Sequence, residues 1–414
     1  MNKLTLNELF SGIGAQRKAL IRIGVPFEVV GISEIDKFAI KSYESIYGKT
    51  YNYGDIRTIK KLNYADFWTY SFPCTDISVA GKRAGINKNT RSGLLYEVQR
   101  LLEISKQHSE LPKYLMLENV KNLVGKKFKA DFDNWITYLD NLGYSTYWKV
   151  LNAKDFGIPQ NRERVYAISI RKDLSYKFNF PTGKSLFTSL IDILEKEVDE
   201  TFYLQPKTVE YFIRNSISNE IKGNGFRFSP FKPDDKEYVK TITTKPASRM
   251  EGNFIIAASR GRNPNNPSDR SKGCTTKQRL ELNSNGISNT ITTVQKDNYV
   301  VEKKIINLGN LYPNGSFGGN PQQGRIYSLT GLSPTITVSH SSWPKIYQSY
   351  NIRKLTPLEC WRLMGFDDSD FWSAKNSGVS NTQLYKQAGN SIVVNVLEEI
   401  FKNLFVNSQY EKNE

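Results

Sequence analysis

Short apolar runs alternate with amphipathic stretches over the first 172 residues. Strands are predicted at 4–10, 28–33, 65–70, 112–117, 144–151 and 164–170. Helices are predicted at 16–23, 36–47, 131–142 and from residue 93, where apolar side chains recur at helical spacing. This alternation of strand and helix predicts an α/β fold whose core is a doubly wound, Rossmann-like sheet.

The pattern changes after about residue 172. Between 173 and 352 the helical periodicity weakens, and Asn, Gly, Ser and Pro become frequent. A Thr-Ile-Thr triplet recurs at 241–243, 290–292 and 335–337, and a turn and an apolar stretch follow each copy. Such repeats are typical of β-hairpins, so residues 173–352 are expected to form a second, β-rich domain.

Helical patterning returns near the C-terminus. Thr356 is expected to cap a helix that begins at Pro357 and ends near Gly365. A last helix is predicted to start at Ser391, which follows Asn390, because apolar residues then recur to about position 404.

Polar residues stand where the strands at 4–10 and 28–33, and a further short strand before residue 55, are expected to end. Gly12 and Gly14 follow the first strand, and Glu34 ends the second, 22 positions beyond Gly12. A glycine turn lets the backbone approach a ligand, and an acidic residue at this spacing can accept hydrogen bonds from ribose hydroxyls. Asp55 is placed at the end of a third strand. An ordinary turn with a helix-capping carboxylate is the alternative, but the combination favours a nucleoside-type cofactor.

A second group of polar residues has the character of a catalytic site. The strand at 65–70 leads through a Pro to Cys74, whose thiolate would be a strong nucleophile. The alternative is that Cys74 is only a buried residue at the end of the strand. Glu118 ends the next apolar run. Arg162 and Arg164, two positions apart in an extended segment, are predicted to lie on one side and to hold a flat polar ring or phosphates.

Composition narrows the class of partner. Lys and Arg number 57 against 41 Asp and Glu, and the net charge of +16 favours a polyanion, with nucleic acid ahead of an anionic membrane. The three Cys residues are far apart, which argues against a zinc site and for a reducing cytoplasm. No signal-like or membrane-spanning apolar stretch stands out, so a cytoplasmic protein is expected.

In their order along the chain, these stretches resemble the DNA (cytosine-5) methyltransferases of bacterial or phage restriction–modification type. The resemblance covers nearly all of residues 4–170 and 353–405. The motifs that carry it are Phe10-x-Gly12-x-Gly14, Glu34, Asp55, Phe72-Pro73-Cys74, Glu118-Asn119-Val120, Gln160-x-Arg162-x-Arg164, the 353–366 segment and Gly389-Asn390-Ser391.

The resemblance implies S-adenosylmethionine as the cofactor. Phe10 would lie against the adenine, Glu34 would hold the ribose and Asp55 would accept a hydrogen bond from the adenine amine. The remaining residues expected to line the cofactor site are Gly12, Gly14 and Asn390. The sequence departs from the family pattern at Ala15, Ile35 and Thr75, which leaves details of cofactor packing open.

The same resemblance implies the catalytic roles and the domains. Cys74 would be the nucleophile, Glu118 and Arg164 would hold the target base, and Arg162 would position Arg164 or a phosphate. Residues 1–172 and 353–414 would form the catalytic domain, and 173–352 would recognise the target sequence in double-stranded DNA. A monomer is expected, with any cognate restriction endonuclease acting separately.

Other activities fit the residues less well. An NAD-dependent oxidoreductase leaves Cys74 and Glu118 unexplained, and a cysteine hydrolase would have only His108 and His340 as histidine bases. A transfer-RNA cytosine-5 methyltransferase on the same framework is the main alternative. A catalytically silent DNA-binding paralogue is a further one, disfavoured because every catalytic position is filled.

Overall fold

The computed structural model divides the chain into two units. The first contains residues 1–193, 237–246 and 357–414, and the second contains 194–236 and 247–356. The residues that the structure describes are 3–73, 77, 91–183, 188–205, 207–209, 211–212, 215, 239–241, 254–262, 277–281, 307–310, 325–328, 345–347 and 351–407. Cys74 lies outside the described residues, and so do the three Thr-Ile-Thr copies apart from Thr241.

A six-stranded mixed sheet forms the centre of the first unit. Its strand order is β2 (Phe27–Ser33), β1 (Leu4–Leu9), β3 (Phe67–Tyr70), β4 (Tyr114–Val120), β7 (Glu163–Arg171) and β5 (Tyr144–Asn152). The first four strands pair in parallel, whereas β7 is antiparallel to both of its neighbours. Several of the predicted site residues lie at or just after the carboxyl ends of these parallel strands.

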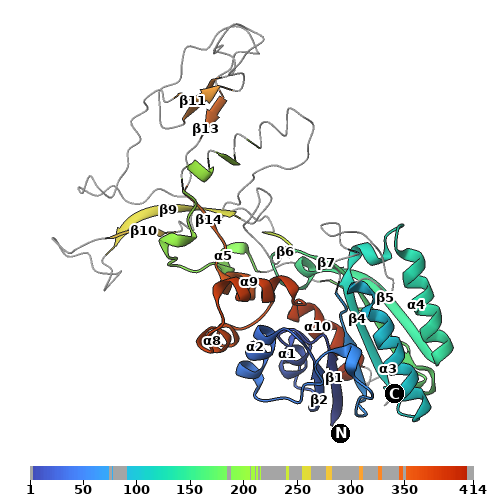
Figure 1. The fold of residues 1–414 in the computed structure, drawn as a ribbon. Coiled ribbons are helices and arrows are strands. Elements are labelled where there is room, and N and C mark those ends of the chain that lie inside the picture. Colours follow the sequence, from blue (N-terminus) through green and yellow to red (C-terminus); the bar gives the residue numbers. More distant parts are fainter. Residues whose placement is uncertain are drawn as a thin grey trace. The chain divides into compact units, whose positions relative to one another are not determined.

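Helices cover both faces of this sheet (Figure 1). Because side chains alternate along a strand, Trp68 and Tyr70 of β3 join the cluster under α3 (Leu95–Gln107) and α4 (Lys129–Leu142). Phe67 points the other way and packs edge-on against Phe401 of α10 (Val394–Phe401), with ring centroids 5.4 Å apart. The helices α1 (Ala15–Arg22) and α2 (Lys37–Tyr47) follow β1 and β2 in the chain. The predicted doubly wound α/β fold is confirmed.

Three local predictions differ from the structure. The expected third strand before Asp55 is reduced to a single bridge between Asn52 and Ile32, and Asp55 instead begins a 3-10 turn, η1 (Ile56–Thr58). The helices α8 (Asp368–Asn376) and α9 (Asn381–Asn390) were not predicted. Ser391 ends α9 rather than capping the last helix, because its N–H donates back to the Gln387 carbonyl at 3.0 Å.

The helix predicted after Thr356 is present. It is α7 (Pro357–Arg362), which starts at Pro357 as expected and is followed by Gly365 with a positive φ of 81°. A short helix, α5 (Leu190–Ile193), also belongs to the first unit. The two-residue strands β6 (Gln160–Asn161) and β8 (Val239–Lys240) pair in parallel within the first unit.

The described part of the second unit consists mainly of strands. One three-stranded sheet contains β10 (Lys277–Glu281), β9 (Phe254–Arg262) and β14 (Asn351–Lys354), all antiparallel. Another contains β11 (Asn307–Asn310), β12 (Arg325–Ser328) and β13 (Lys345–Tyr347), in which β12 and β13 are parallel. Two of the apolar stretches that follow the Thr-Ile-Thr copies therefore form strands, β9 and β13.

A network of ion pairs joins the N-terminal and C-terminal segments of the first unit. Lys18 of α1 is buried, and its Nζ lies 2.7 Å from Asp370 and 2.6 Å from Asp367. Arg22, one turn further along α1, pairs with Asp367 at 2.6 Å and with Glu398 of α10 at 2.8 Å. Since Asp370 is itself buried, this network needs Lys18 to compensate its charge.

We predict that Lys18→Met destabilises the first unit by about 3 kcal/mol, because it leaves the buried Asp370 carboxylate without its cation. Urea denaturation followed by fluorescence measures the loss. The matched control is Lys3→Met, which removes an exposed pair with Glu28 and should cost less than about 1 kcal/mol. Equal stability of the two variants would contradict the prediction.

Candidate active site

The site lies at the carboxyl edge of the parallel strands. The chain leaves β1 through α1 to β2 on one side and later returns to β3 on the other side of β1, which makes a topological switch point between β1 and β3. Ligands bind outside such a point in open α/β sheets. Leu9 pairs with Tyr70, and Tyr70 pairs with Leu117, so the loops that follow these three residues leave the sheet next to one another.

The loop after β1 depends on left-handed backbone conformations. Phe10, Gly12 and Gly14 have φ values of 59°, 55° and 78°. A Cβ on Gly14 would lie 2.6 Å from the Tyr47 ring and 2.8 Å from the Tyr43 ring, so packing also excludes a side chain there. A Cβ on Gly12 would meet nothing within 4 Å, which leaves open space beside the loop.

Glu34 ties the loop after β1 to the start of the loop after β2. Its Oε2 accepts a hydrogen bond from the Gly12 N–H at 2.9 Å. Its Oε1 accepts from the N–H groups of Ile35 and Asp36, each at 2.8 Å. The predicted acidic residue therefore lies beside the predicted glycine turn, and its carboxylate fixes the shape of that turn.

Asn52 was not predicted as a site residue, yet it connects Glu34 to Asp55. Its Oδ1 accepts from the Glu34 N–H at 3.2 Å and from the Gly54 N–H at 2.9 Å, and its Nδ2 donates to the Glu34 carbonyl at 3.0 Å. Asp55 follows directly. Hydrogen bonds from the Arg57 side chain hold the pKa of Asp55 below its usual value. An Asn shortly before Gly-Asp in a sequence indicates only a turn. The hydrogen bonds by which Asn52 connects Glu34 to the Asp55 segment could therefore not be predicted.

A buried carboxyl group lies within the β1–α1 unit. Glu8 is fully buried, its Oε2 accepts from the Tyr43 hydroxyl, and its Oε1 accepts from the Arg17 N–H at 3.2 Å. Burial raises the pKa of Glu8 to about 7. Glu8 helps to hold α1 at the end of the glycine loop. In the sequence, only the presence of an acidic residue within an apolar strand could have indicated this role.

Glu118 and Arg164 face one another at the end of β4. Glu118 is buried, and its Oε1 lies 3.4 Å from Arg164 Nε. Burial raises the pKa of Glu118, whereas the charges of Arg164 and Arg162 act in the opposite direction. Since burial outweighs the two cations, the carboxyl group retains its proton to a higher pH than an exposed Glu.

Arg162 binds backbone carbonyls near the end of α9. The side chain is buried, and Nη2 donates to the carbonyls of Gly389 at 3.1 Å and Ser391 at 2.7 Å. These carbonyls flank the exposed Asn390, the last residue of α9. The structure therefore brings Arg162 to the predicted cofactor residue Asn390, and Arg164 to the predicted catalytic residue Glu118.

The segment that leads to Cys74 is held from β4. Cys74 itself is outside the described residues, but Phe72 and Pro73 are described, and Phe72 is buried. Nδ2 of Asn119, the residue after Glu118, donates to the Phe72 carbonyl at 3.0 Å. This contact joins the strand end that carries Glu118 to the strand end that precedes Cys74.

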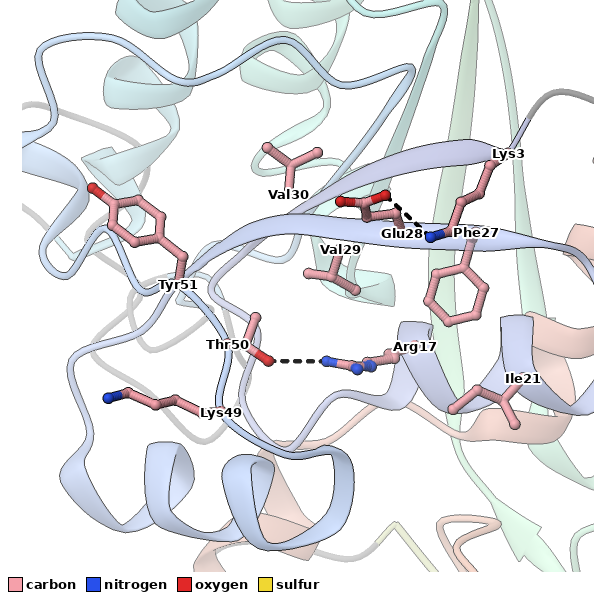
Figure 2. Close-up of a pocket in the computed structure, with 10 residues that line it drawn as sticks. All are labelled: Lys3, Arg17, Ile21, Phe27, Glu28, Val29, Val30, Lys49, Thr50 and Tyr51. Atoms are coloured by element: carbon pink, nitrogen blue, oxygen red, sulfur yellow. Dashed lines mark hydrogen bonds and ion pairs between the residues drawn. The ribbon is translucent and has the colours of Figure 1, made fainter.

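A pocket of about 520 Å³ lies elsewhere on the first unit (Figure 2). It is lined by β2 residues such as Phe27 and Val29, by Arg17 and Ile21 of α1, and by the loop that contains Thr50. Figure 2 shows the Arg17 guanidinium bonded to Thr50, at 3.0 Å. None of the predicted site residues lines this pocket.

Among the residues that the structure describes, no group of three or more His, Cys, Asp or Glu side chains is placed to bind a metal ion. No helix in this described part is both long enough and apolar enough to span a bilayer.

Comparison with protein families gives one match over nearly the whole chain. The model for the C-5 cytosine-specific DNA methylases matches residues 4–406. The type II methyltransferase M2.ScrFI of Lactococcus lactis subsp. cremoris is 34% identical, over 97% of this chain and 99% of its own length. The orphan methyltransferase M.SPBetaI of Bacillus phage SPbeta is also 34% identical, over 99% of this chain and 100% of its own.

Solved structures share the fold at lower identity. The S. pombe Dnmt2 methyltransferase superposes with a TM-score of 0.59 and 19% identity and covers both chains completely. The Entamoeba histolytica methyltransferase EhMeth has a TM-score of 0.61 and 16% identity, with 98% of this chain and 99% of its own covered. At these identities the likeness concerns the fold alone.

Proposed function

Because this chain belongs to the C-5 cytosine-specific DNA methylase family, we propose that it methylates one cytosine within a short specific sequence of duplex DNA through a covalent bond to Cys74. The chain is a DNA (cytosine-5) methyltransferase, and enzymes of this class take their methyl group from S-adenosylmethionine. The single observation that carries the catalytic proposal is the pairing of the buried Glu118 with Arg164 beside the strand end that leads to Cys74.

The edge formed by β1 and β2 suits a nucleoside cofactor. Gly12 leaves open space, and the half-buried Phe10 is proposed to lie against the adenine. Glu34 and Asp55 supply acceptors for ribose hydroxyls and an adenine amine, and Asn390 is exposed at the end of α9. We assign these residues, with Gly14, to the cofactor site. When bound, S-adenosylmethionine supplies an electrophilic methyl group.

The residue types follow from the chemistry of cytosine. C5 is a weak nucleophile until a group adds to C6. We assign that step to the Cys74 thiolate, whose Sγ–C6 bond forms as electrons move toward N3. The resulting enamine lets C5 take the methyl group. Loss of the C5 proton then restores the C5–C6 double bond and expels the thiolate.

Glu118 and Arg164 are proposed to hold the base during addition. A protonated Glu118 can donate to N3, where negative charge develops, and its raised pKa keeps that proton available. Arg164 can donate a hydrogen bond to the O2 atom of the cytosine. Arg162 holds the backbone on either side of Asn390 in place. Because C6 must be approached from above the ring, the cytosine has to leave the base stack.

The β-rich region over 173–352 is proposed to recognise the DNA sequence, while 1–172 and 353–414 carry out catalysis. This division is supported by the two sheets of the second unit, and the overall charge of +16 supports a polyanionic substrate. Relatives named as type II and phage orphan methyltransferases support a modification role in the cytoplasm, with or without a separate endonuclease. We propose that the enzyme acts as a monomer.

The first prediction concerns Cys74. DNA that carries 5-fluorocytosine at the target should trap the wild-type protein covalently in the presence of cofactor, because fluorine cannot leave C5 as a cation. Gel shift under denaturing conditions measures the adduct. Cys74→Ser should form none, while Cys360→Ser, which changes a buried cysteine of α7, should be trapped normally. An adduct with the Cys74→Ser protein would refute the role of Cys74.

The second prediction concerns Glu118. Glu118→Gln keeps the size of the side chain but removes the acidic proton, so single-turnover methylation should slow by about 100-fold while cofactor affinity stays unchanged. Because the pKa of Glu118 is raised, the wild-type rate should fall as the pH rises through that pKa. The variant should lose this falling limb. A pH profile of identical shape in both proteins would exclude Glu118 as the proton donor.

A further inference from the structure

Three side chains donate hydrogen bonds to backbone carbonyls on either side of residues 74–76. Besides Asn119, which binds the Phe72 carbonyl, Ser92 Oγ donates to the Pro73 carbonyl at 2.8 Å. On the far side, Asn122 Nδ2 donates to the carbonyl of Ile77, a buried residue. The described residues on both sides of 74–76 are thus held by side chains distant in the sequence.

We propose that Ser92 and Asn122 are positioning residues, which aim the nucleophile by fixing the peptides that flank it. This inference rests on the proposed role of Cys74. Neither residue needs to touch the substrate, and each would act through the backbone of the nucleophile segment.

The hydrogen bond from Ser92 fixes one backbone angle, ψ of Pro73. The pyrrolidine ring holds φ of Pro73 near one value, and the peptide that joins Pro73 to Cys74 is planar. The direction in which the chain enters Cys74 therefore depends mainly on ψ of Pro73. A hydrogen bond to the Pro73 carbonyl oxygen fixes that angle, so the hydroxyl of Ser92 sets the approach of the chain to the nucleophile.

Both donors stand on elements that the core holds in place. Ser92 is fully buried in the 3-10 turn η2 (Arg91–Leu94), which runs directly into α3 with its buried Leu95 and Val98. Asn122 belongs to the turn η3 (Lys121–Val124), whose Leu123 is buried in the same core cluster. Anchors of this kind can hold a reacting group within a fraction of an ångström, and a misplacement of about 1 Å can cost 100-fold in rate.

The test removes each hydrogen-bond donor, and Ser92→Ala does so with little change in volume. Ser92→Ala and Asn122→Ala should each slow the formation of the 5-fluorocytosine adduct, and single-turnover methylation, by about 10-fold, the factor that corresponds to one hydrogen bond. Dissociation constants for S-adenosylmethionine and for duplex DNA should stay within about twofold of wild type, because neither side chain is assigned to binding.

A matched control is Ser105→Ala, which removes another buried hydroxyl from α3 without touching the nucleophile segment. Its adduct rate should equal that of the wild type. Urea denaturation of all variants shows whether any loss of rate reflects unfolding. Since the two donors stand on different elements, the Asn122→Ala protein keeps the test valid if Ser92→Ala does not fold.

The outcomes separate this inference from the proposed function. If wild-type protein forms no adduct, Cys74 is not the nucleophile and both proposals fall together. If the wild type is trapped and the variants at Ser92 and Asn122 are trapped equally fast, only the positioning role is overturned. A slower rate that merely follows weaker DNA or cofactor binding would overturn it as well.

Discussion

The parallel pairing of β1, β3 and β4 is the constraint on which the site depends. Leu9, Tyr70 and Leu117 form a row across the sheet, so the loop of Phe10, the segment before Cys74 and the Glu118 turn leave one edge together. Burial maintains this register, because a slip of one residue would turn the core side chains of a strand toward the opposite face. The helices on both faces therefore stabilise the site as well as the fold.

Much of this arrangement could be predicted from local patterns. Apolar runs located the strands, and glycine and acidic residues at their ends located the site. Local patterns failed where distant partners decide the structure. Where a strand was expected before Asp55, Asn52 instead bonds across to the chain around Glu34, and Asp55 caps a 3-10 turn. In α9, buried apolar side chains are few, Leu384 and Ala388, so no helical period was visible there.

The site is built largely from side chains that bind backbone. Glu34 bonds the N–H of Gly12, Arg162 bonds the carbonyls around Asn390, and Ser92 bonds the carbonyl of Pro73. Such contacts need no characteristic spacing in the sequence, so the hydrogen bonds of Arg162 to the carbonyls of Gly389 and Ser391 could not be predicted. Preorganised loops of this kind reduce the reorganisation needed when substrate binds.

The central claim is sequence-specific methylation of DNA at cytosine C5. The most direct measurement is to express the protein in a host without cytosine methylation and to sequence bisulfite-treated DNA and RNA. The account predicts near-complete resistance to conversion at one cytosine of one short DNA motif, abolished by Cys74→Ser. Resistance confined to a transfer RNA, or none in either nucleic acid from a folded protein, would contradict it.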